Sequence, residues 1–419
     1  MYYLRSTIFF SEILTLSHTM LLKNKIIIFL GNARFDGNIK STSFFIAQNL
    51  AKHNKVFFVD YPFTLKDYFR TSFNTPELRL RKQKFSLFSD GRIRTKVENL
   101  EIIVTPPVLP INFLPEGAIF RWLLKFNQSI IARRLKKILT AERFTEFIYI
   151  NAFNFHYPDI GKIIKPTLSV YQCVDPMIVP YDMKHGIYSE NHLVKNSDLV
   201  ICTSNALYVE KSKQNINTYF IPNGTDLNSK NATNTSFPVH EKLKNIAPPL
   251  IGYLGTIERR INYELIANVM MLNPDKSFVF AGPVSDGFVP EAIYKLKNAH
   301  FLGAIAHQEV EQIISNFDVA IIPFKKDEVS KTIFPIKLFE YLSAGKPVVA
   351  TDFNEDLKDY TEDRVAYCGT STSFSDALNE ALANDSEYEK QQRRQLAQKN
   401  TWEVRADQFA EILSSHLKH

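Results

Sequence analysis

A lysine and a glutamate one helical turn apart have the chemistry of a ligand site. Lys337 and Glu340 lie in FPIKLFEYLSAGKPVVATD, residues 334–352. Residues three apart in a helix share one face, so both side chains lie near the start of this helix on the same side. A helix N-terminus and a lysine suit phosphate, and a carboxylate one turn further suits sugar hydroxyls. The alternative is an intrahelical salt bridge, which stabilises a helix by only about 0.2–0.5 kcal/mol.

A tight glycine turn followed by two arginines forms a second group. In IGYLGTIERRINYELI, residues 251–266, a strand leads through Gly255 and Thr256 into a helix. Glycine lets the backbone approach a ligand closely, and Arg259 and Arg260 stand near the start of that helix. The turn does not complete the G-x-G-x-x-G fingerprint, so it does not favour a dinucleotide-dependent oxidoreductase.

Two aspartates follow predicted strands in the first half of the chain. Asp175 ends YQCVD, and Asp36 stands in RFDG after the first strand. Parallel sheets bind ligands at the carboxyl ends of their strands, where both aspartates are expected. Asp175 could take a proton from a substrate hydroxyl or could cap a turn. Asp36, with Arg34 beside it, could bind a substrate or form an Asx turn before Gly37.

The elements that position these residues alternate between strand and helix. KIIIFLG, STSFFIAQNLAKH and KVFFVDYP read as strand, helix and strand, which predicts a parallel sheet with helices on its faces. Residues 63–139 are less regular. The strands EFIYIN, TLSVYQCVD, DLVICTS and TYFIPNG follow, and a second series runs from PLIGYLGTI to VAYCG. The predicted fold is α/β, with two Rossmann-like, doubly wound domains facing each other across a cleft.

Shifts in composition set the expected domain boundaries. Residues 1–22 are expected to be a poorly ordered extension, because charged and polar residues interrupt any signal-peptide core. The first domain is expected at 23–229 and a polar, proline-bearing linker region at 230–249. The second domain is expected at 250–400, followed by a C-terminal helix at 401–419.

Composition excludes several classes of protein. The chain has 419 residues and a net charge of +6, which is too modest for a dedicated nucleic-acid binder. Its three cysteines stand far apart, in no metal-ligand spacing, which fits a reducing cytoplasm. No run of residues is long and apolar enough to span a bilayer. We therefore expect a cytoplasmic protein.

One predicted helix could place the protein on a membrane. FRWLLKFNQSIIARRLKKIL, residues 120–139, contains aromatic side chains and no acidic residue. Its basic residues are Arg121, Lys125, Arg133, Arg134, Lys136 and Lys137. Such a helix can lie on an anionic leaflet, here the inner face of the cell membrane, or can pack on the sheet with a solvated basic edge.

The order of these pieces resembles that in a known family. RFDG, YQCVD, IPNGTD, GYLGTIERRINYELI, HFLGAI, FDVAIIPF and PIKLFEYLSAGKPVVATD follow one another from residue 34 to 352. This order is similar to that of bacterial glycosyltransferases of the GT-B fold, group 1 or family 4-like, related to exopolysaccharide and teichuronic-acid synthesis enzymes. The resemblance is strongest over residues 251–352.

The resemblance implies a role for each candidate residue. Lys337 matches the lysine that meets the phosphates of a nucleotide-diphosphate sugar, and Glu340 matches the glutamate that holds ribose hydroxyls. Arg260, in the GT-x3-R loop with Gly255 and Thr256, is expected near the diphosphate. The implied enzyme is a metal-independent hexosyltransferase without a cofactor, which uses the nucleotide sugar as co-substrate. A lipid-linked or glycan hydroxyl would be the acceptor, in cell-surface polysaccharide synthesis.

One departure leaves the stereochemistry open. Many retaining GT-B enzymes carry a second glutamate eight positions before the first, and Thr332 stands there. Asp175 would be the base in an inverting enzyme and an acceptor-orienting group in a retaining one, while Asp36 and Arg34 are candidates for binding the acceptor. Two alternative functions are a GT-B nucleotide-sugar epimerase and a non-catalytic sugar-nucleotide-binding partner.

Overall fold

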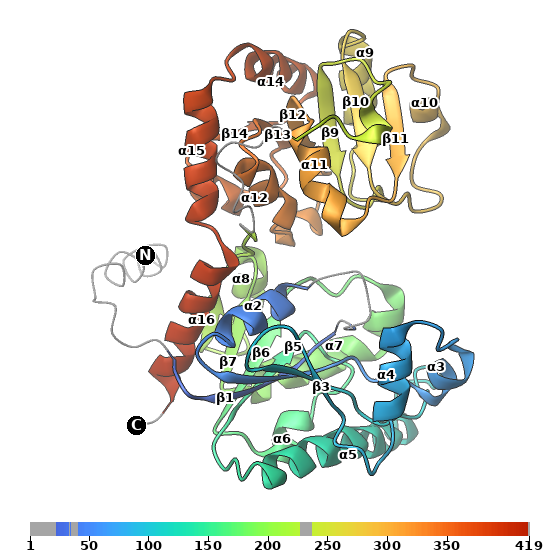
Figure 1. Ribbon diagram of the computed structural model, residues 1–419, viewed down its shortest axis with the longest axis vertical. Helices are drawn as coiled ribbons and strands as arrows, with labels where there is room; N and C mark the ends of the chain where they lie inside the picture. The colour runs from blue at the N-terminus through green and yellow to red at the C-terminus, as the bar shows by residue number, and fades with distance from the viewer. Residues whose placement is uncertain (1–21, 33, 35–40, 227–236, 418–419) are drawn as a thin grey trace.

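The computed structural model describes residues 22–32, 34, 41–226 and 237–417, which form two α/β domains, one above the other in Figure 1. The expected extension and the first part of the expected linker therefore lie mostly outside the described residues. The first domain holds an eight-stranded sheet of order β3-β4-β2-β1-β5-β6-β7-β8, and the second a six-stranded sheet of order β11-β10-β9-β12-β13-β14. All pairings are parallel except that of β3 with β4.

The first sheet is covered on both faces because its strand residues alternate between two cores. Ile27 and Phe29 belong to a core with α2 and α16, whereas Ile28 and Leu30 belong to a core with α5 and α6. The strands are β1 (Ile26–Leu30), β2 (Lys55–Val59), β3 (Arg92–Arg94), β4 (Leu100–Ile103), β5 (Ile148–Ala152), β6 (Leu168–Cys173), β7 (Leu199–Cys202) and β8 (Thr218–Phe220). The helices are α2 (Thr42–Leu50), α3 (Leu65–Arg70), α4 (Pro76–Lys84), α5 (Ala118–Ala141), α6 (Ile160–Ile164), α7 (Pro180–Asn196) and α8 (Asn205–Ser212).

The four central strands of the second sheet are short, fully buried runs, as expected for central parallel strands, whereas its two edge strands are partly exposed. Its strands are β9 (Leu250–Leu254), β10 (Ser277–Ala281), β11 (Ala299–Gly303), β12 (Val319–Ile322), β13 (Val348–Thr351) and β14 (Val365–Cys368). The α-helices around it are α9 (Tyr263–Leu272), α10 (Glu291–Tyr294), α11 (Val310–Ser315), α12 (Ile336–Ser343), α13 (Asp356–Asp359), α14 (Ser371–Ala383) and α15 (Glu387–Gln398). Short 3₁₀ turns lie at Glu241–Leu243, His307–Glu309 and Ser330–Thr332.

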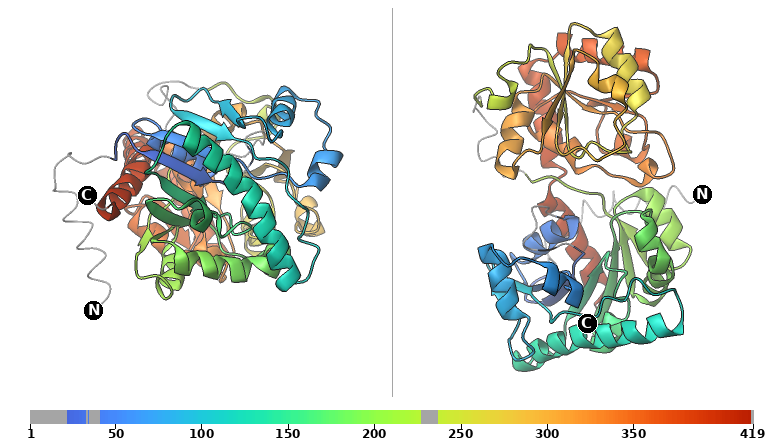
Figure 2. Two further views of the ribbon diagram at one scale, coloured as in Figure 1. Left: turned by 90° about the horizontal axis from the view of Figure 1, so that it is seen from below. Right: turned by 90° about the vertical axis from the view of Figure 1, so that its right-hand side faces the viewer.

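The chain returns to the first domain at its end, which the sequence did not indicate. Helix α16 (Trp402–His416) packs against α2, and the Trp402 ring stacks on Phe45 with centroids 5.0 Å apart. Both views in Figure 2 show this helix, in red, beside the first sheet. The irregular region from residue 63 also holds three elements that were not expected, α3, α4 and β3. No helix in the described part of the chain is long and apolar enough to cross a membrane.

Candidate active site in the cleft between the domains

Two glycines allow the loop after β9 to approach α12 closely. Gly255 has φ +133°, and a Cβ there would lie 2.6 Å from Lys337 Nζ. Gly282, which follows β10, has φ +147°, and its Cβ would lie 2.2 Å from the Gly255 carbonyl oxygen. Any side chain at either position would push the loop or the lysine away. The sequence analysis identified Gly255 but missed Gly282, whose signal was a glycine directly after a buried strand.

Lys337 is held inside this loop without a carboxylate partner. Its Nζ donates to the Tyr253 hydroxyl at 2.7 Å and lies 3.9 Å from the centroid of the Tyr253 ring. Burial and the nearby charge of Arg260 lower the Lys337 pKa to about 7, against the opposing charges of Glu340 and Glu258. Within the described residues no salt bridge joins Lys337 to Glu340, so the intrahelical pair is not formed.

Helix α12 presents an uncapped N-terminus beside this lysine. Pro335 occupies the N-cap position and accepts no amide hydrogen through a side chain, and Gly345, with φ +74°, follows the end of the helix. The first amide groups of a helix have no partner within it and attract anions. Glu340, one turn in, is partly exposed, and burial raises its pKa against the opposing charge of Lys337.

Arg260 lies between the lysine and the opposite domain. Its guanidinium pairs with the Glu258 carboxylate and lies 5.7 Å from the Phe324 ring centroid. Its positive charge lowers the pKa of both Lys337 and Asp175, so it is close enough to act on each. Thr256 is exposed at the tip of the same loop, and its carbonyl accepts a hydrogen bond from the Tyr253 hydroxyl at 3.0 Å.

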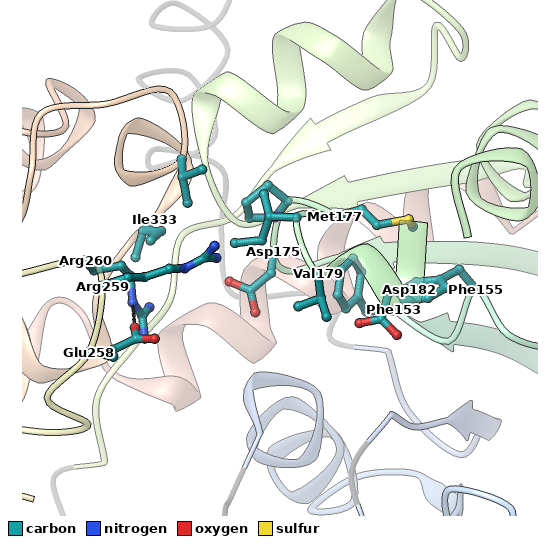
Figure 3. Close-up of a pocket in the computed structure, with 13 residues that line it drawn as sticks. Phe153, Phe155, Asp175, Met177, Val179, Asp182, Glu258, Arg259, Arg260 and Ile333 are labelled. Carbon is teal, nitrogen blue, oxygen red and sulfur yellow. Dashed lines mark hydrogen bonds and ion pairs between the residues drawn. The ribbon is translucent and has the colours of Figure 1, made fainter. Parts of the chain in front are cut away.

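Asp175 faces this loop from the first domain. It follows β6, and burial raises its pKa to about 6 in spite of the charge of Arg260. Both domains line the pocket of about 240 Å³ that contains it. Figure 3 shows Glu258, Arg259 and Arg260 on one side and Asp175, Met177 and Val179 on the other. The aspartate after β6 therefore lies at the cleft edge of its strand, as predicted.

The sequence analysis missed the rest of the pocket wall on this side. Phe153, directly after β5, adopts φ +55° and packs edge-on against Phe155 at 5.2 Å. Asp182 lines the pocket from the first turn of α7, with His156 Nε2 3.6 Å from its Oδ1. Burial lowers the His156 pKa to about 4, so this imidazole is neutral near pH 7. The one available signal, for Phe153 alone, was its position just after a predicted strand.

Of the predicted acceptor pair, only Arg34 is described, and it does not line this pocket. The Arg34 guanidinium lies 4.5 Å from the Phe63 ring centroid, and Arg34 is not among the residues that line the cleft. Asp36 lies outside the described residues. No group of three or more histidine, cysteine, aspartate or glutamate side chains gathers as a metal site in the part of the chain that the structure describes.

Comparisons with known proteins agree with this architecture. Residues 248–384 match the family model described as glycosyl transferases group 1. A candidate teichuronic acid biosynthesis glycosyltransferase of Bacillus subtilis (strain 168), TuaH, is 26% identical over 218 residues, which is 48% of this chain and 55% of the relative. The match thus spans about half the length of that relative.

Solved structures resemble the whole fold. Sucrose-phosphate synthase from Thermosynechococcus elongatus superposes with a TM-score of 0.65 at 15% identity, over 94% of this chain and 99% of its own. Anabaena HepE, solved in complex with UDP and glucose, gives 0.63 at 16% identity, over 94% and 100% of the two chains. The expected α/β fold is confirmed: the chain has the GT-B fold. The residues that match the model of group 1 glycosyl transferases lie in its second domain.

Replacing Lys337 by alanine is expected to weaken binding of a nucleoside diphosphate and to leave binding of the bare nucleoside unchanged. A charge-assisted hydrogen bond contributes about 1.5–3 kcal/mol, so the diphosphate Kd should rise about 10-fold to 150-fold. Removing a buried ammonium that has no carboxylate partner should not lower the free energy of unfolding of the empty protein. Isothermal titration calorimetry and chemical denaturation measure the two effects.

The matched control is Lys331→Ala, which removes an exposed lysine paired with Glu328 just before α12. Equal diphosphate affinity in Lys337→Ala and Lys331→Ala would remove Lys337 from the phosphate site.

Proposed function

We propose that the protein transfers a sugar from a nucleotide-diphosphate sugar to an acceptor hydroxyl in cell-surface polysaccharide synthesis. The carrying observation is that Lys337, which has no carboxylate partner among the described residues, lies beside an uncapped helix N-terminus, and that the charge of Arg260 acts both on this lysine and on Asp175 of the opposite domain. A cation without a carboxylate partner fits an anionic ligand, and a carboxylate in the pocket wall of the opposite domain fits a proton acceptor. The name of the Bacillus relative and the UDP and glucose bound by the Anabaena neighbour support this assignment.

The donor diphosphate would lie between the Gly255 loop and α12. Lys337, Arg260 and the first amides of α12 would hold its phosphates, with Gly255 and Thr256 forming the loop and Glu340 binding the ribose hydroxyls. As the bond from the anomeric carbon to the phosphate oxygen breaks, negative charge grows on the leaving diphosphate. Fixed cations and helix dipoles in a cleft stabilise such charge, so the proposed reaction needs no metal ion or other cofactor.

The acceptor would enter from the side of the first domain. Asp175 would take the proton of the attacking hydroxyl as its oxygen bonds to the anomeric carbon on the face opposite the leaving diphosphate, and such a single displacement inverts that carbon. A carboxylate with a pKa of about 6 is ionised near pH 7 and is a stronger base than an ordinary aspartate. The apolar walls made by Phe153, Met177 and Val179 would cover the part of the acceptor next to that hydroxyl.

A lipid-linked acceptor fits the surface next to the cleft. Val179 lines the pocket and is 47% exposed, and other large apolar side chains of α7, of α5 and of the loop before α5 are exposed as well. They are Phe113, Ile119, Trp122, Phe126, Tyr181, Met183, Ile187 and Tyr188. The Arg121 guanidinium lies 4.3 Å from the Tyr188 ring centroid, and Lys184 Nζ donates to the Phe113 carbonyl at 3.2 Å, so the two helices share this surface.

The structure changes which basic residues of α5 could meet a membrane. Arg134 is buried and donates to the carbonyls of Ser86 and Ser89, so its place in the predicted basic face was wrong. Arg121 forms an ion pair with Glu116. The side chains of Lys125, Arg133 and Lys136 are exposed on the same helix as Trp122. Aromatic and basic side chains together suit an anionic bilayer surface, so we include peripheral membrane contact in the proposal.

The rate of transfer should show a bell-shaped dependence on pH. Asp175 must lose its proton to act as a base, so kcat/KM should rise with pH through about 6. Lys337 must keep its proton to bind phosphate, so kcat/KM should fall again above about 7. Nucleoside diphosphate release measured from pH 4.5 to 9 tests both limbs. A profile that is flat between pH 5 and 8 contradicts the assignment.

Asp175→Asn keeps the shape of the side chain and removes the base. Turnover should fall about 10²-fold to 10⁴-fold, and the acid limb of the pH profile should disappear. Donor affinity should stay near that of the wild type, because the donor binds to the other domain. Asp198→Asn is the matched control. This exposed aspartate lies at the opposite end of the sheet, where it accepts a hydrogen bond from the Ser169 amide, and it does not line the cleft pocket.

The anomeric configuration of the product decides between base and orienting group. A product that keeps the configuration of the donor, with a raised acceptor KM and an unchanged kcat in Asp175→Asn, would make Asp175 an acceptor-orienting residue instead.

Replacing Lys125, Arg133 and Lys136 by glutamine should reduce co-sedimentation with anionic phospholipid vesicles. Each basic residue near such a surface contributes about 1 kcal/mol, and salt should weaken the binding. Trp122→Ala should reduce it further, because the indole would lie at the headgroup level.

The matched control replaces Lys244, Lys295 and Lys399, which are exposed on or beside the second domain. Equal co-sedimentation of both triple variants, or none of the wild type at low salt, would leave α5 as a purely structural helix.

A further inference from the structure

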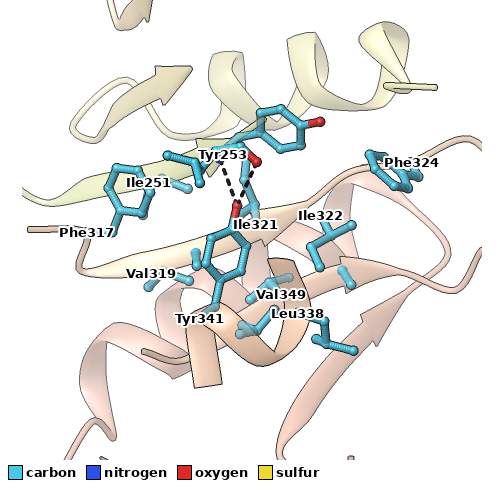
Figure 4. Close-up of a cluster of buried hydrophobic side chains, with 14 of the residues drawn as sticks. Ile251, Tyr253, Phe317, Val319, Ile321, Ile322, Phe324, Leu338, Tyr341 and Val349 are labelled. Atoms are coloured by element: carbon cyan, nitrogen blue, oxygen red, sulfur yellow. Dashed lines mark hydrogen bonds between the residues drawn. The ribbon is translucent and has the colours of Figure 1, made fainter. Parts of the chain in front are cut away.

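Tyr253 is the residue in closest contact with the Lys337 ammonium group. It is the fourth residue of β9, is 1% exposed, and belongs to the core of the second domain, shown in Figure 4. Its hydroxyl oxygen accepts a hydrogen bond from Lys337 Nζ at 2.7 Å, and its ring lies under the same nitrogen at 3.9 Å. A buried tyrosine usually satisfies its hydroxyl with one backbone group, whereas this hydroxyl also binds a cation.

The direction of these hydrogen bonds is fixed by the loop. The Tyr253 hydroxyl donates its one proton to the Thr256 carbonyl at 3.0 Å, so its lone pairs are left to face Lys337. Burial raises the Tyr253 pKa well above its usual value, so the phenol stays neutral and keeps that proton. The chain Lys337–Tyr253–Thr256 thereby connects the position of the ammonium group to the conformation of the glycine loop.

The charged groups around Lys337 do not replace this contact. Arg260, from the loop, opposes the ammonium, while Glu258 from that loop and Glu340 from α12 favour it. Glu258 is already paired with Arg260, and neither carboxylate lies within salt-bridge distance of Nζ among the described residues. The hydroxyl and ring of Tyr253, together with the Phe324 ring centroid 5.2 Å from Nζ, are therefore the contacts that hold the ammonium group beside the loop in the empty protein.

We propose that Tyr253 is a positioning residue for diphosphate binding, which holds the Lys337 amino group directed at the Gly255 loop before the ligand arrives. The inference rests on the proposed function, since it assigns a task to a neighbour of the proposed phosphate site. A preorganised cation loses less freedom when the ligand binds, so the tyrosine contributes to affinity without touching phosphate. The chemical class of the ligand is a nucleoside diphosphate, with pyrophosphate as its minimal part.

The test compares Tyr253→Phe with Tyr263→Phe, using uridine diphosphate and inorganic pyrophosphate as probes in calorimetry. The Tyr263 hydroxyl also donates to a carbonyl of the same loop, that of Glu258 at 2.9 Å, but makes no contact with Lys337. Tyr253→Phe should weaken binding of both probes about fivefold to tenfold, as expected for one lost hydrogen bond. Tyr263→Phe should leave both affinities unchanged.

Two further readouts separate a positioning role from a structural one. In a Lys337→Ala background Tyr253→Phe should cause no additional loss, because the tyrosine acts through the lysine. The pH above which diphosphate affinity falls should move lower in Tyr253→Phe, since the ammonium loses an acceptor, and should stay fixed in Tyr263→Phe. An equal loss with and without Lys337, or an unmoved pH dependence, would overturn the proposal.

The outcomes also distinguish this proposal from the proposed function. If the wild type binds neither probe, the donor site itself is refuted and the positioning role with it. If the wild type binds both and Tyr253→Phe binds equally well, only the role of Tyr253 is refuted.

Discussion

The structure of the cleft depends on burying one ammonium group without a carboxylate beside it. Removing a charge from water costs several kcal/mol unless other groups compensate, and Lys337 receives only a hydroxyl, two aromatic rings and distant carboxylates. The lowered pKa of Lys337 shows that these groups do not fully compensate for burying its charge. An anionic ligand would supply the missing compensation, so the site is electrostatically incomplete until such a ligand binds. This arrangement requires three residues. Gly255 leaves space for the lysine, Gly282 leaves space for the Gly255 carbonyl, and Tyr253 accepts the hydrogen bond of the ammonium group.

The geometry between the two halves of the cleft is set where the chain crosses between the domains. The Asn223 side chain accepts a hydrogen bond from Thr42 Oγ1 at 2.9 Å and donates to the Phe334 carbonyl at 2.7 Å. Nearby, Thr225 pairs with the strand-like segment at Thr401, before α16 returns to the first domain. Asn223, a buried residue of the segment that crosses between the domains, thus links α2 to Phe334, just before α12. Lys337 is three residues beyond the Phe334 carbonyl, so this contact helps to fix how far the cation lies from Asp175.

Sequence reasoning could find the parts of the site that depend on local order. The helix carrying Lys337 and Glu340 and the turn at Gly255 have strong local signals: an apolar stripe, a terminal glycine and a strand-glycine-helix order. Asp182, Phe153 and Tyr253 could not be singled out, because their roles depend on which segments the fold brings together. The basic pattern around Arg134 was misleading for the same reason. Arg134 donates to carbonyls of the turn after α4, more than forty residues away in the chain, and no helical periodicity could predict a contact with that turn.

Burial drives the two central groups of the cleft toward neutrality from opposite sides. It raises the pKa of Asp175 to about 6 and lowers that of Lys337 to about 7, while the charge of Arg260 lowers both. Arg260 therefore favours the ionised aspartate and disfavours the ionised lysine, and its own pairing with Glu258 limits both effects. A diphosphate bound at Lys337 and Arg260 would favour the charged form of the lysine. It would also offset the charge of Arg260, which would then stabilise the ionised form of Asp175 less. The same anion would thus keep the lysine charged and make the aspartate more basic, so that occupancy of the donor site strengthens the proton acceptor across the cleft.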